Sequence, residues 1–222
     1  MKKDSPRVSI GVPVFNGENY LAEMLESILT QTYANFELII SDNASMDRTE
    51  MICRAYAARD GRIRYSRSET NLGAAGNFNH VFELASGEYF KWAAHDDLCA
   101  PEYLERCVEI LDREPDVVLC YPRTRIIGER GELLEDYFDG FHLDSPMPHR
   151  RFRDGFRAPG LCNPVFGLIR ASVLKRTLLI GSYASSDRVL LEELALWGKF
   201  YEVPEYLFLR RSHPQRSLRA NV

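Results

Sequence analysis

Short apolar runs alternate with amphipathic segments along the first hundred residues. Four runs have the length and the β-branched or aromatic content of buried strands: VSIGVPV (8–14), FELIIS (36–41), IRYS (63–66) and YFKWAA (89–94). After the first run, apolar residues recur at helical spacing, which predicts a helix over about 18–32. Further helices are expected from Asp47 to about Ala58, from the turn at 71–76 to about Gly87, and after Pro101. This alternation predicts an α/β domain with a mostly parallel central sheet flanked by helices.

The second half of the chain has a less regular pattern. Strands are expected at 117–121, 124–128, 165–170 and 206–211, with a turn over 128–131. A helix is expected from about Asp187 to Trp197, with Gly198 ending it and Trp197 in the core. Residues 139–160 hold prolines, glycines and a cluster of arginines. That composition predicts a long loop, and long loops often close over a binding site.

Polar groups stand where the apolar runs end, as at Phe15-Asn16 and Asp42-Asn43. Ligands of parallel sheets bind beyond the carboxyl ends of the strands. Asp42 could therefore accept hydrogen bonds from a nucleobase or a ribose, or it could form an Asx turn. Asp47 is expected to cap the helix that follows it.

Two adjacent carboxylates, Asp96 and Asp97, follow the fourth run. Neighbouring carboxylates repel each other unless they share a cation. Mg²⁺ or Mn²⁺ is commonly held by one or two carboxylates, with phosphate oxygens completing the shell. The pair therefore suggests a metal and phosphate site, and the alternative is an acidic loop that precedes the helix at Pro101.

Composition excludes several classes of protein. The 222 residues are 45% hydrophobic and 27% charged, which is unlike a disordered chain, a fibre or a disulfide scaffold. The formal net charge of −4 disfavours a nucleic-acid partner, and no apolar run approaches the length of a transmembrane helix. The five cysteines form no C-x-x-C pair, so reduced thiols and a cytoplasmic location are expected. The motifs of P-loop NTPases, dinucleotide dehydrogenases, α/β-hydrolases and H-E-x-x-H enzymes are absent.

The ordered set of motifs resembles glycosyltransferase family 2, a group of GT-A-fold enzymes that use nucleotide-diphosphate sugars. The pieces that carry the resemblance are VSIGVPVFNGENYLAEMLESILTQTY, FELIISDNASMDRT, Asn71-Leu72-Gly73 with Asn79, SGEYFKWAAHDD and RRSHP. They cover about 7–110 densely and 160–216 loosely. The resemblance implies one Rossmann-like GT-A domain over 1–222, with a nucleotide-sugar-binding half at about 7–110 and a less regular acceptor-side half at about 111–222.

The resemblance also implies roles for individual residues. Asp42 would hydrogen-bond the base, which is expected to be uracil. Asp96, Asp97 and His213 would hold a divalent cation, Mn²⁺ or Mg²⁺. The implied nucleotide-binding residues are Pro13, Val14, Phe15, Asn16, Asp42, Asn71, Asn79, Asp96 and Arg211. One position departs from the family's D-x-D motif, because Ala94 replaces its first Asp and removes one carboxylate near the ribose or the metal.

Inverting members of this family take the acceptor proton with an Asp or Glu that opens a helix in the acceptor half. Asp187 opens the helix expected there, so the resemblance assigns it as the catalytic base. Ser186 and Asp187 are also good N-cap residues, and Glu192 and Glu193 are rival carboxylates.

Together these features are interpreted as a cytoplasmic glycosyltransferase. It would move a sugar from a UDP-sugar to an acceptor hydroxyl, with inversion, in glycan or cell-surface polysaccharide synthesis. The acceptor is expected to be a glycan or lipid-linked, and Arg150, Arg151 and Arg153 either contact an anionic acceptor or form a solvated loop. Peripheral contact with the inner membrane face stays open, although no basic amphipathic helix is evident in the sequence.

Two other functions remain alternatives at this point. A non-catalytic nucleotide-sugar-binding module is favoured by Ala94 in the D-x-D motif. A nucleotidyltransferase shares the architecture, but it usually carries a glycine-rich, basic loop after the first strand. Residues 14–18, VFNGE, do not form such a loop.

Overall fold

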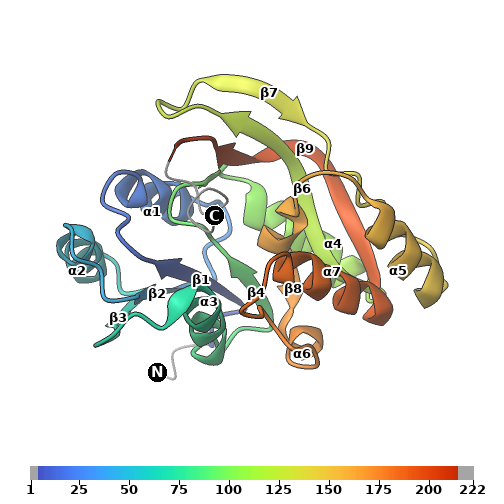
Figure 1. The fold of residues 1–222 in the computed structure, drawn as a ribbon, viewed down its shortest axis with the longest axis horizontal. Coiled ribbons are helices and arrows are strands. Elements are labelled where there is room, and N and C mark those ends of the chain that lie inside the picture. The colour runs from blue at the N-terminus through green and yellow to red at the C-terminus, as the bar shows by residue number, and fades with distance from the viewer. Residues whose placement is uncertain (1–4, 215–222) are drawn as a thin grey trace.

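The computed structural model describes residues 5–214, which fold into a single α/β domain built on one nine-stranded sheet (Figure 1). Within these residues the strands are β1 (Val8–Val14), β2 (Phe36–Asp42), β3 (Ile63–Arg67), β4 (Tyr89–Trp92), β5 (Leu98–Cys99), β6 (Val117–Ile127), β7 (Leu133–Tyr137), β8 (Leu168–Arg170) and β9 (Lys199–Arg211). The helices are α1 (Leu21–Leu29), α2 (Thr49–Arg59), α3 (Gly73–Glu83), α4 (Tyr103–Arg113), α5 (Pro148–Arg157), the 3₁₀ turn η1 (Asn163–Phe166), α6 (Ala171–Leu174) and α7 (Ser186–Trp197). The strand order is β3-β2-β1-β4-β8-β6-β9-β5, and β7 pairs with β6.

Strands β1 to β4 form the parallel half of the sheet that the sequence predicts. β1 pairs in parallel with β2 and with β4, and β2 pairs in parallel with β3. All seven residues of β1 are buried, because helices cover both faces of the sheet, so this strand is small or apolar along most of its length. The register sets Val14 beside Asp42. The carboxyl ends of β1 and β2 therefore meet at one edge of the sheet.

The second half of the sheet mixes parallel and antiparallel pairs. β8 is antiparallel to both β4 and β6, whereas β6 is parallel to β9. β6 is one continuous strand where the sequence predicts two, and Pro122 falls at a shift in the β6–β9 register. A residue without an N–H group is tolerated at such an irregularity. β9 begins at Lys199, well before the predicted strand at 206–211.

Two apolar layers hold the helices against the sheet. One layer joins α1 and α4 to β1 and β2, and the other joins α3 and α7 to β4 and β6. In α1 the buried residues are Leu21, Met24, Leu25 and Ile28. They match the predicted spacing, although the helix is shorter than the predicted 18–32. The layered arrangement leaves one sheet edge, where the parallel strands end, free for a site.

Residues 139–160 are not the loop that the sequence predicts, because 148–157 form helix α5, which lies beside α7 (Figure 1). Pro148 stands at the start of the helix, where its fixed φ favours the first turn. The sequence gives no apolar periodicity here, because the positions that α5 buries are Arg151 and Gly155. A search for hydrophobic faces therefore misses this helix.

Four further features bear on the sequence predictions. Trp197 is 46% exposed and does not lie in the core, and the predicted strand at 165–170 is a 3₁₀ turn followed by the short β8. The five cysteines are free thiols, as expected. Among the helices of residues 5–214, none is both long and apolar enough to cross a bilayer.

Gly11 in β1 lies against α3 with no room for a side chain. A Cβ there would come within 2.6 Å of Val81 Cγ2 and 2.8 Å of Phe90 Cζ. We expect Gly11→Ala to lower the free energy of unfolding by about 1–3 kcal/mol, the usual cost of overpacking a core. Gly61→Ala is the matched control, because a Cβ at Gly61 meets nothing within 4 Å. Urea denaturation measures both variants, and equal losses would contradict the packing argument.

Candidate functional site

A cleft of about 400 Å³ opens at the edge where β1, β2 and β4 end. Its walls come from the residues that follow these strands, from the first two turns of α3 and from the end of η1. The lining residues are Pro13, Val14, Phe15, Asn43, Asn71, Gly73, Ala74, Asn77, Phe78, Ala94, His95, Asp96 and Phe166. The predicted site residues Pro13, Val14, Phe15, Asn71 and Asp96 are thus brought together.

The end of β1 forms an apolar wall of this cleft. Phe15 is 41% exposed, and its ring is the flat, accessible part of the wall. Asn16 does not line the cleft. Its φ of 51° lies in the left-handed region that Asn tolerates, and its Oδ1 accepts a hydrogen bond from Met46 N at 2.9 Å. Asn16 therefore fastens the turn after β1 to the turn after β2.

An amide pair, Asn43 and Asn71, forms a polar wall of the same cleft. Asn43 Nδ2 donates to Asn71 Oδ1 at 2.8 Å, and Leu72 N donates to Asn43 Oδ1 at 2.7 Å. Asn71 Oδ1 also accepts from Gly73 N at 2.8 Å, which shapes the turn that opens α3. Asn71 Nδ2 has no partner within residues 5–214, so it is a hydrogen-bond donor that a ligand can use.

Asp42 stands behind this wall and does not line the cleft. Its side chain is fully buried, its Oδ1 accepts from Ser45 N at 2.8 Å, and its Oδ2 accepts from the Tyr65 hydroxyl at 2.9 Å. Arg67 Nε lies 3.4 Å from the same Oδ2. Burial, followed by the hydrogen bond to Asp42, raises the pKa of Tyr65. The residue of this strand end that faces the cavity is Asn43, which sequence reasoning noted only as a neighbour of Asp42.

The two asparagines of α3 have different surroundings. Asn77 lines the cleft and is 3% exposed; its Nδ2 donates to Ser41 O at 3.0 Å, while its Oδ1 is an acceptor without a partner among the described residues. Asn79 does not line the cleft. Its amide donates to Ile180 O at 2.9 Å and accepts from Ile180 N at 3.0 Å. Asn79, which the resemblance lists among the nucleotide-binding residues, therefore holds the segment before α7.

Asp96, which lines the cleft, is in contact with His213. Their Oδ2 and Nε2 atoms are 2.8 Å apart, although 117 positions separate them in the sequence. The His213 ring packs on Tyr20 with a centroid distance of 4.8 Å. His95, next to Asp96, lines the cleft, and burial lowers its imidazole pKa below the ordinary value of 6.5. The cleft lining therefore includes a carboxylate and one imidazole, and the buried His213 imidazole lies directly against that carboxylate.

Arg211 does not face the cleft, in contrast to the prediction that it contacts phosphates. It is 1% exposed, and its backbone N donates to Asp97 Oδ1 at 2.8 Å. Each nitrogen of the guanidinium donates to a protein acceptor: Asp96 O at 3.0 Å, Gly128 O at 3.2 Å, Glu129 O at 2.9 Å and Glu23 Oε2 at 2.6 Å. A buried guanidinium needs such partners. Arg211 and Asp97 therefore hold the segment that carries Asp96 against the segment that carries His213.

The donor atoms at this edge fit a divalent cation as a partial shell. Within residues 5–214, no three His, Cys, Asp or Glu side chains are grouped as a complete metal site. Asp96 and His213 supply one oxygen and one nitrogen, and Mn²⁺ accepts both ligand types. A bound diphosphate would supply further oxygens. Ala94 lies in the cleft lining, where the family motif has another carboxylate.

Asp187 stands in the first turn of α7 and is partly exposed. Its Oδ1 accepts from Arg188 N at 2.8 Å. Burial, with a smaller contribution from Asp187, raises the pKa of the Cys162 thiol to about 11. Cys162 directly precedes η1, whose last residue, Phe166, lines the cleft. Asp187 is thus near the acceptor-side wall, although it is not part of the cleft lining.

The backbone carbonyl of Phe166 is bound by a buried cation, Lys91. Lys91 is fully buried, and its Nζ donates to Phe166 O at 2.6 Å and lies 4.4 Å from the centre of the Tyr103 ring. The Tyr103 hydroxyl donates to the same carbonyl at 2.8 Å. No pattern in the sequence pointed to Phe166 as a wall of the site, because this position depends on contacts between β4, α4 and η1.

The model of the family described as glycosyl transferase family 2 matches residues 9–177. The chain belongs to glycosyltransferase family 2. The resemblance seen in the sequence is therefore confirmed, and the domain is a glycosyltransferase domain.

Relatives and solved structures agree with this assignment. An uncharacterised glycosyltransferase of Rickettsia typhi is 32% identical over 212 residues, which is 92% of this chain and 61% of the relative, so the chain spans less than two thirds of it. S. aureus TarS 1–349 in complex with UDP-GlcNAc has a TM-score of 0.75 at 20% identity, covering 95% of this chain and 60% of that one. The mannosyltransferase PcManGT of Pyrobaculum calidifontis, in complex with GDP-Man and Mn²⁺, has a TM-score of 0.68 at 19% identity, covering 96% and 58%. These likenesses confirm the GT-A fold.

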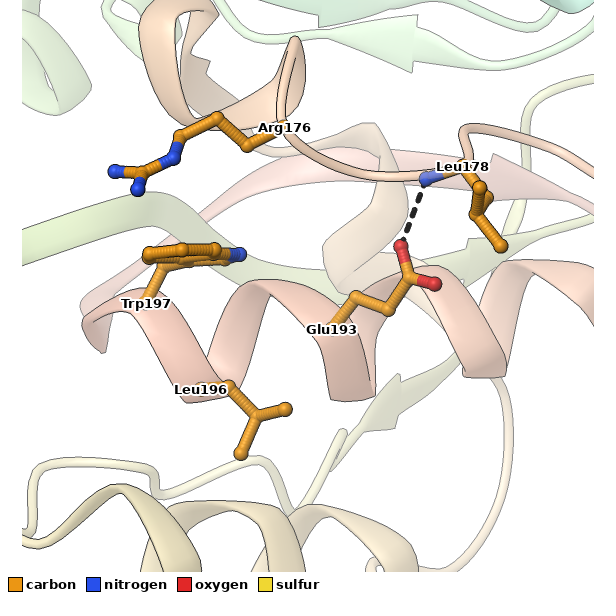
Figure 2. A pocket seen from close by; sticks show the side chains of 5 residues that line it. All are labelled: Arg176, Leu178, Glu193, Leu196 and Trp197. Atoms are coloured by element: carbon orange, nitrogen blue, oxygen red, sulfur yellow. Dashed lines mark hydrogen bonds between the residues drawn. The ribbon is translucent and has the colours of Figure 1, made fainter.

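Of the two rival carboxylates on α7, Glu193 has a hydrogen-bond partner outside the strand-end cleft. Figure 2 shows Glu193 with its Oε2 accepting from Leu178 N at 2.9 Å. The figure also shows Arg176 stacked over the ring of Trp197, 3.6 Å from its centroid. These residues line a separate hollow of about 270 Å³ that shares no residue with the strand-end cleft. Glu193 therefore positions the segment before α7 and does not line the strand-end cleft.

Glu192 on α7 is buried at the contact with α5. Its side chain is 6% exposed, and neither carboxylate oxygen has a hydrogen-bond partner among the described residues. A Cβ on Gly155 would come within 3.0 Å of both oxygens. Burial raises the pKa of this carboxyl to about 7. Glu192 is therefore a buried acid at a helix–helix contact.

The raised pKa of Glu192 makes stability depend on pH. Because its folded-state pKa of about 7 exceeds the ordinary 4.5, its contribution is full at low pH and is lost as pH rises through about 7. We expect Glu192→Gln to avoid that loss. The difference in free energy of unfolding, variant minus native chain, should therefore increase by on the order of 1–3 kcal/mol from pH 5 to pH 8. Burial also raises the pKa of the Asp139 carboxyl to about 7. Because Asp139 is present in both proteins, its contribution to the free energy of unfolding cancels in the difference.

Urea denaturation across this pH range measures the difference between the two proteins. Glu193→Gln, on the same helix, is the control and should follow the native profile. Parallel profiles for Glu192→Gln and the native chain would contradict the assignment of a buried acid.

Proposed function

We propose that this domain transfers a sugar from a UDP-sugar to an acceptor hydroxyl. The observation that carries the proposal is the cleft at the strand ends, which joins an apolar wall, an amide wall and the Asp96–His213 pair. TarS, whose fold the chain shares, is described in complex with UDP-GlcNAc. Residues of about 7–110 would bind the donor, and residues of about 111–222 would receive the acceptor.

Two polar atoms of the cleft lining, which lack partners among residues 5–214, would match the edge of a uracil. Uracil presents one N–H donor between two carbonyl acceptors. Asn77 Oδ1 is an acceptor without a partner in this part of the chain, and Asn71 Nδ2 is a donor without one. The flat face of the base would lie against Phe15 at the end of β1, where apolar surface is accessible. Under this proposal, Asn43, Asn71 and Asn77 would take the role in base recognition that the family resemblance implies for Asp42.

The diphosphate would lie toward Asp96 and His213. These two side chains would hold a divalent cation, Mn²⁺ or Mg²⁺, which would neutralise charge on the leaving diphosphate. PcManGT, which shares the fold, is described in complex with Mn²⁺. Asp97 and Arg211 support this role indirectly, because they position the backbone on which Asp96 stands.

Asp187 is our proposed catalytic base. Its carboxylate stands in the first turn of α7, and it contributes, with burial as the larger cause, to the raised pKa of Cys162, which directly precedes η1. It would take the proton of the acceptor hydroxyl as the oxygen attacks the anomeric carbon from the face opposite the diphosphate, giving inversion. Glu192 and Glu193 are weaker choices, because the first is buried and the second is bonded to Leu178 N.

The pathway and the location in the cell belong to the same proposal. We place the activity in glycan or cell-surface polysaccharide synthesis in the cytoplasm, with a glycan or lipid-linked acceptor. Ala94 in the cleft favours one alternative, a domain that binds a nucleotide sugar without turning it over. Measured turnover of a nucleotide sugar would distinguish an enzyme from this non-catalytic domain.

Replacing the proposed base tests the mechanism. We expect Asp187→Asn to reduce sugar transfer or donor hydrolysis by about 10²–10⁴-fold, because the amide cannot accept the proton, while UDP binding stays within about threefold of the native value. The assay is UDP release from a panel of UDP-sugars, with binding followed by calorimetry. Glu193→Gln is the matched carboxylate-to-amide control on the same helix and should keep near-native turnover.

Two results would reject this mechanism. Near-native turnover in Asp187→Asn would remove Asp187 as the base and leave the donor site intact. No turnover of any nucleotide sugar by the native chain, together with normal UDP binding, would favour the non-catalytic module.

A further inference from the structure

The outward face of α5 carries aromatic side chains that nothing in the described chain covers. Phe152 is 41% exposed and Phe156 is 70% exposed. They are four residues apart, so they lie one above the other on the same side of the helix. Met147, which directly precedes the helix, is 45% exposed. Exposed apolar groups gathered on one helix face indicate a contact surface.

Three arginines accompany these rings. Arg150, Arg153 and Arg157 are all exposed, and their three- and four-residue spacing places them along one stripe of the helix. Only Arg153 has an ion pair, with the adjacent Asp154; among the described residues no carboxylate pairs with Arg150 or Arg157. The face is therefore strongly basic on a chain whose formal net charge is −4.

The helix is anchored so that this face points outward. Arg151, which is 4% exposed, donates from Nε to Ala195 O at 2.7 Å and from Nη2 to Leu196 O at 3.3 Å. These carbonyls belong to the last turn of α7, where a cation is favoured. At the other end of α5, Arg188 donates to Gly155 O at 3.2 Å and to Ala158 O at 3.0 Å. The positions that α5 buries are thus polar or small, and its phenylalanines are exposed and available to bind another partner.

We propose that α5 docks this domain on an anionic lipid surface. The rings of Phe152 and Phe156 would enter the headgroup region, and Arg150, Arg153 and Arg157 would bind lipid phosphates. A helix that combines aromatic and basic residues on its free face has the chemistry of an interfacial helix. In Figure 1, α5 lies at one end of the long axis and α2 at the other, so docking through α5 leaves the donor-binding half away from the surface. The proposal does not depend on the sugar donor.

Co-sedimentation with vesicles tests the proposal. The native chain should bind vesicles that contain phosphatidylglycerol and should not bind pure phosphatidylcholine. The variant R150Q/R153Q/R157Q should bind roughly a hundredfold more weakly, at about fivefold for each arginine. F152S/F156S should bind at least about tenfold more weakly at unchanged charge.

Matched variants separate the α5 face from general effects. R54Q/R59Q/R113Q lowers the net charge by the same three units on α2 and α4, and F138S removes a ring that is 71% exposed beside β7. Both should bind vesicles like the native chain. Circular dichroism and UDP binding should be unchanged in all four variants, because none of these residues lines the cleft.

Three outcomes would overturn the proposal. One is that the native chain fails to bind phosphatidylglycerol vesicles. Another is that both arginine triples lose binding equally, which would indicate net charge alone. The last is that F152S/F156S binds as well as the native chain, which would indicate an electrostatic surface for any polyanion rather than a lipid-inserting helix.

Discussion

The parallel register of β1, β2 and β4 is the constraint on which the site depends. It places Val14 beside Asp42 and lets Asn43 N donate to Val14 O at 2.8 Å, so the chain leaves two neighbouring strands at the same level. Both faces of these strands are covered by helices, so unpaired polar groups are tolerated mainly where the strands end. The cleft is therefore a consequence of how the sheet is buried, and its amide wall is the first polar layer beyond the core.

A second, long-range interaction completes the site. Arg211 and Asp97 are 114 positions apart, yet the backbone N of one donates to the carboxylate of the other at 2.8 Å. A buried guanidinium without partners would be costly. The chain satisfies Arg211 with three carbonyls and Glu23, and this brings His213 to Asp96. The end of the last strand is thus tied to the segment that follows the fourth, and the contact between Asp96 and His213 exists only when the whole sheet is assembled.

The sequence predicts the first half of the molecule well, because local patterns decide it. The strand runs at 8–14, 36–41, 63–66 and 89–94 each correspond to a strand of the parallel half. The cleft lining was predicted less completely. Asn43 and Asn77 line the cleft and Asp42 does not, because the neighbouring turns already bond the Asp42 carboxylate. Helix α5 was missed for a related reason: its buried positions are Arg151 and Gly155, and a periodicity of apolar residues cannot reveal them.

The central claim is that the strand-end cleft is a nucleotide and metal site. Calorimetric titration tests it most directly, with UDP, GDP, dTDP and CDP each titrated in the presence of Mn²⁺ and again with a chelator. The account predicts that UDP binds best, that the chelator weakens its binding at least about tenfold, and that Asp96→Asn removes this metal dependence. It also predicts that Asn77→Leu weakens UDP binding while leaving the metal dependence in place. Binding of UDP that is independent of metal and unaffected by either substitution would contradict the account.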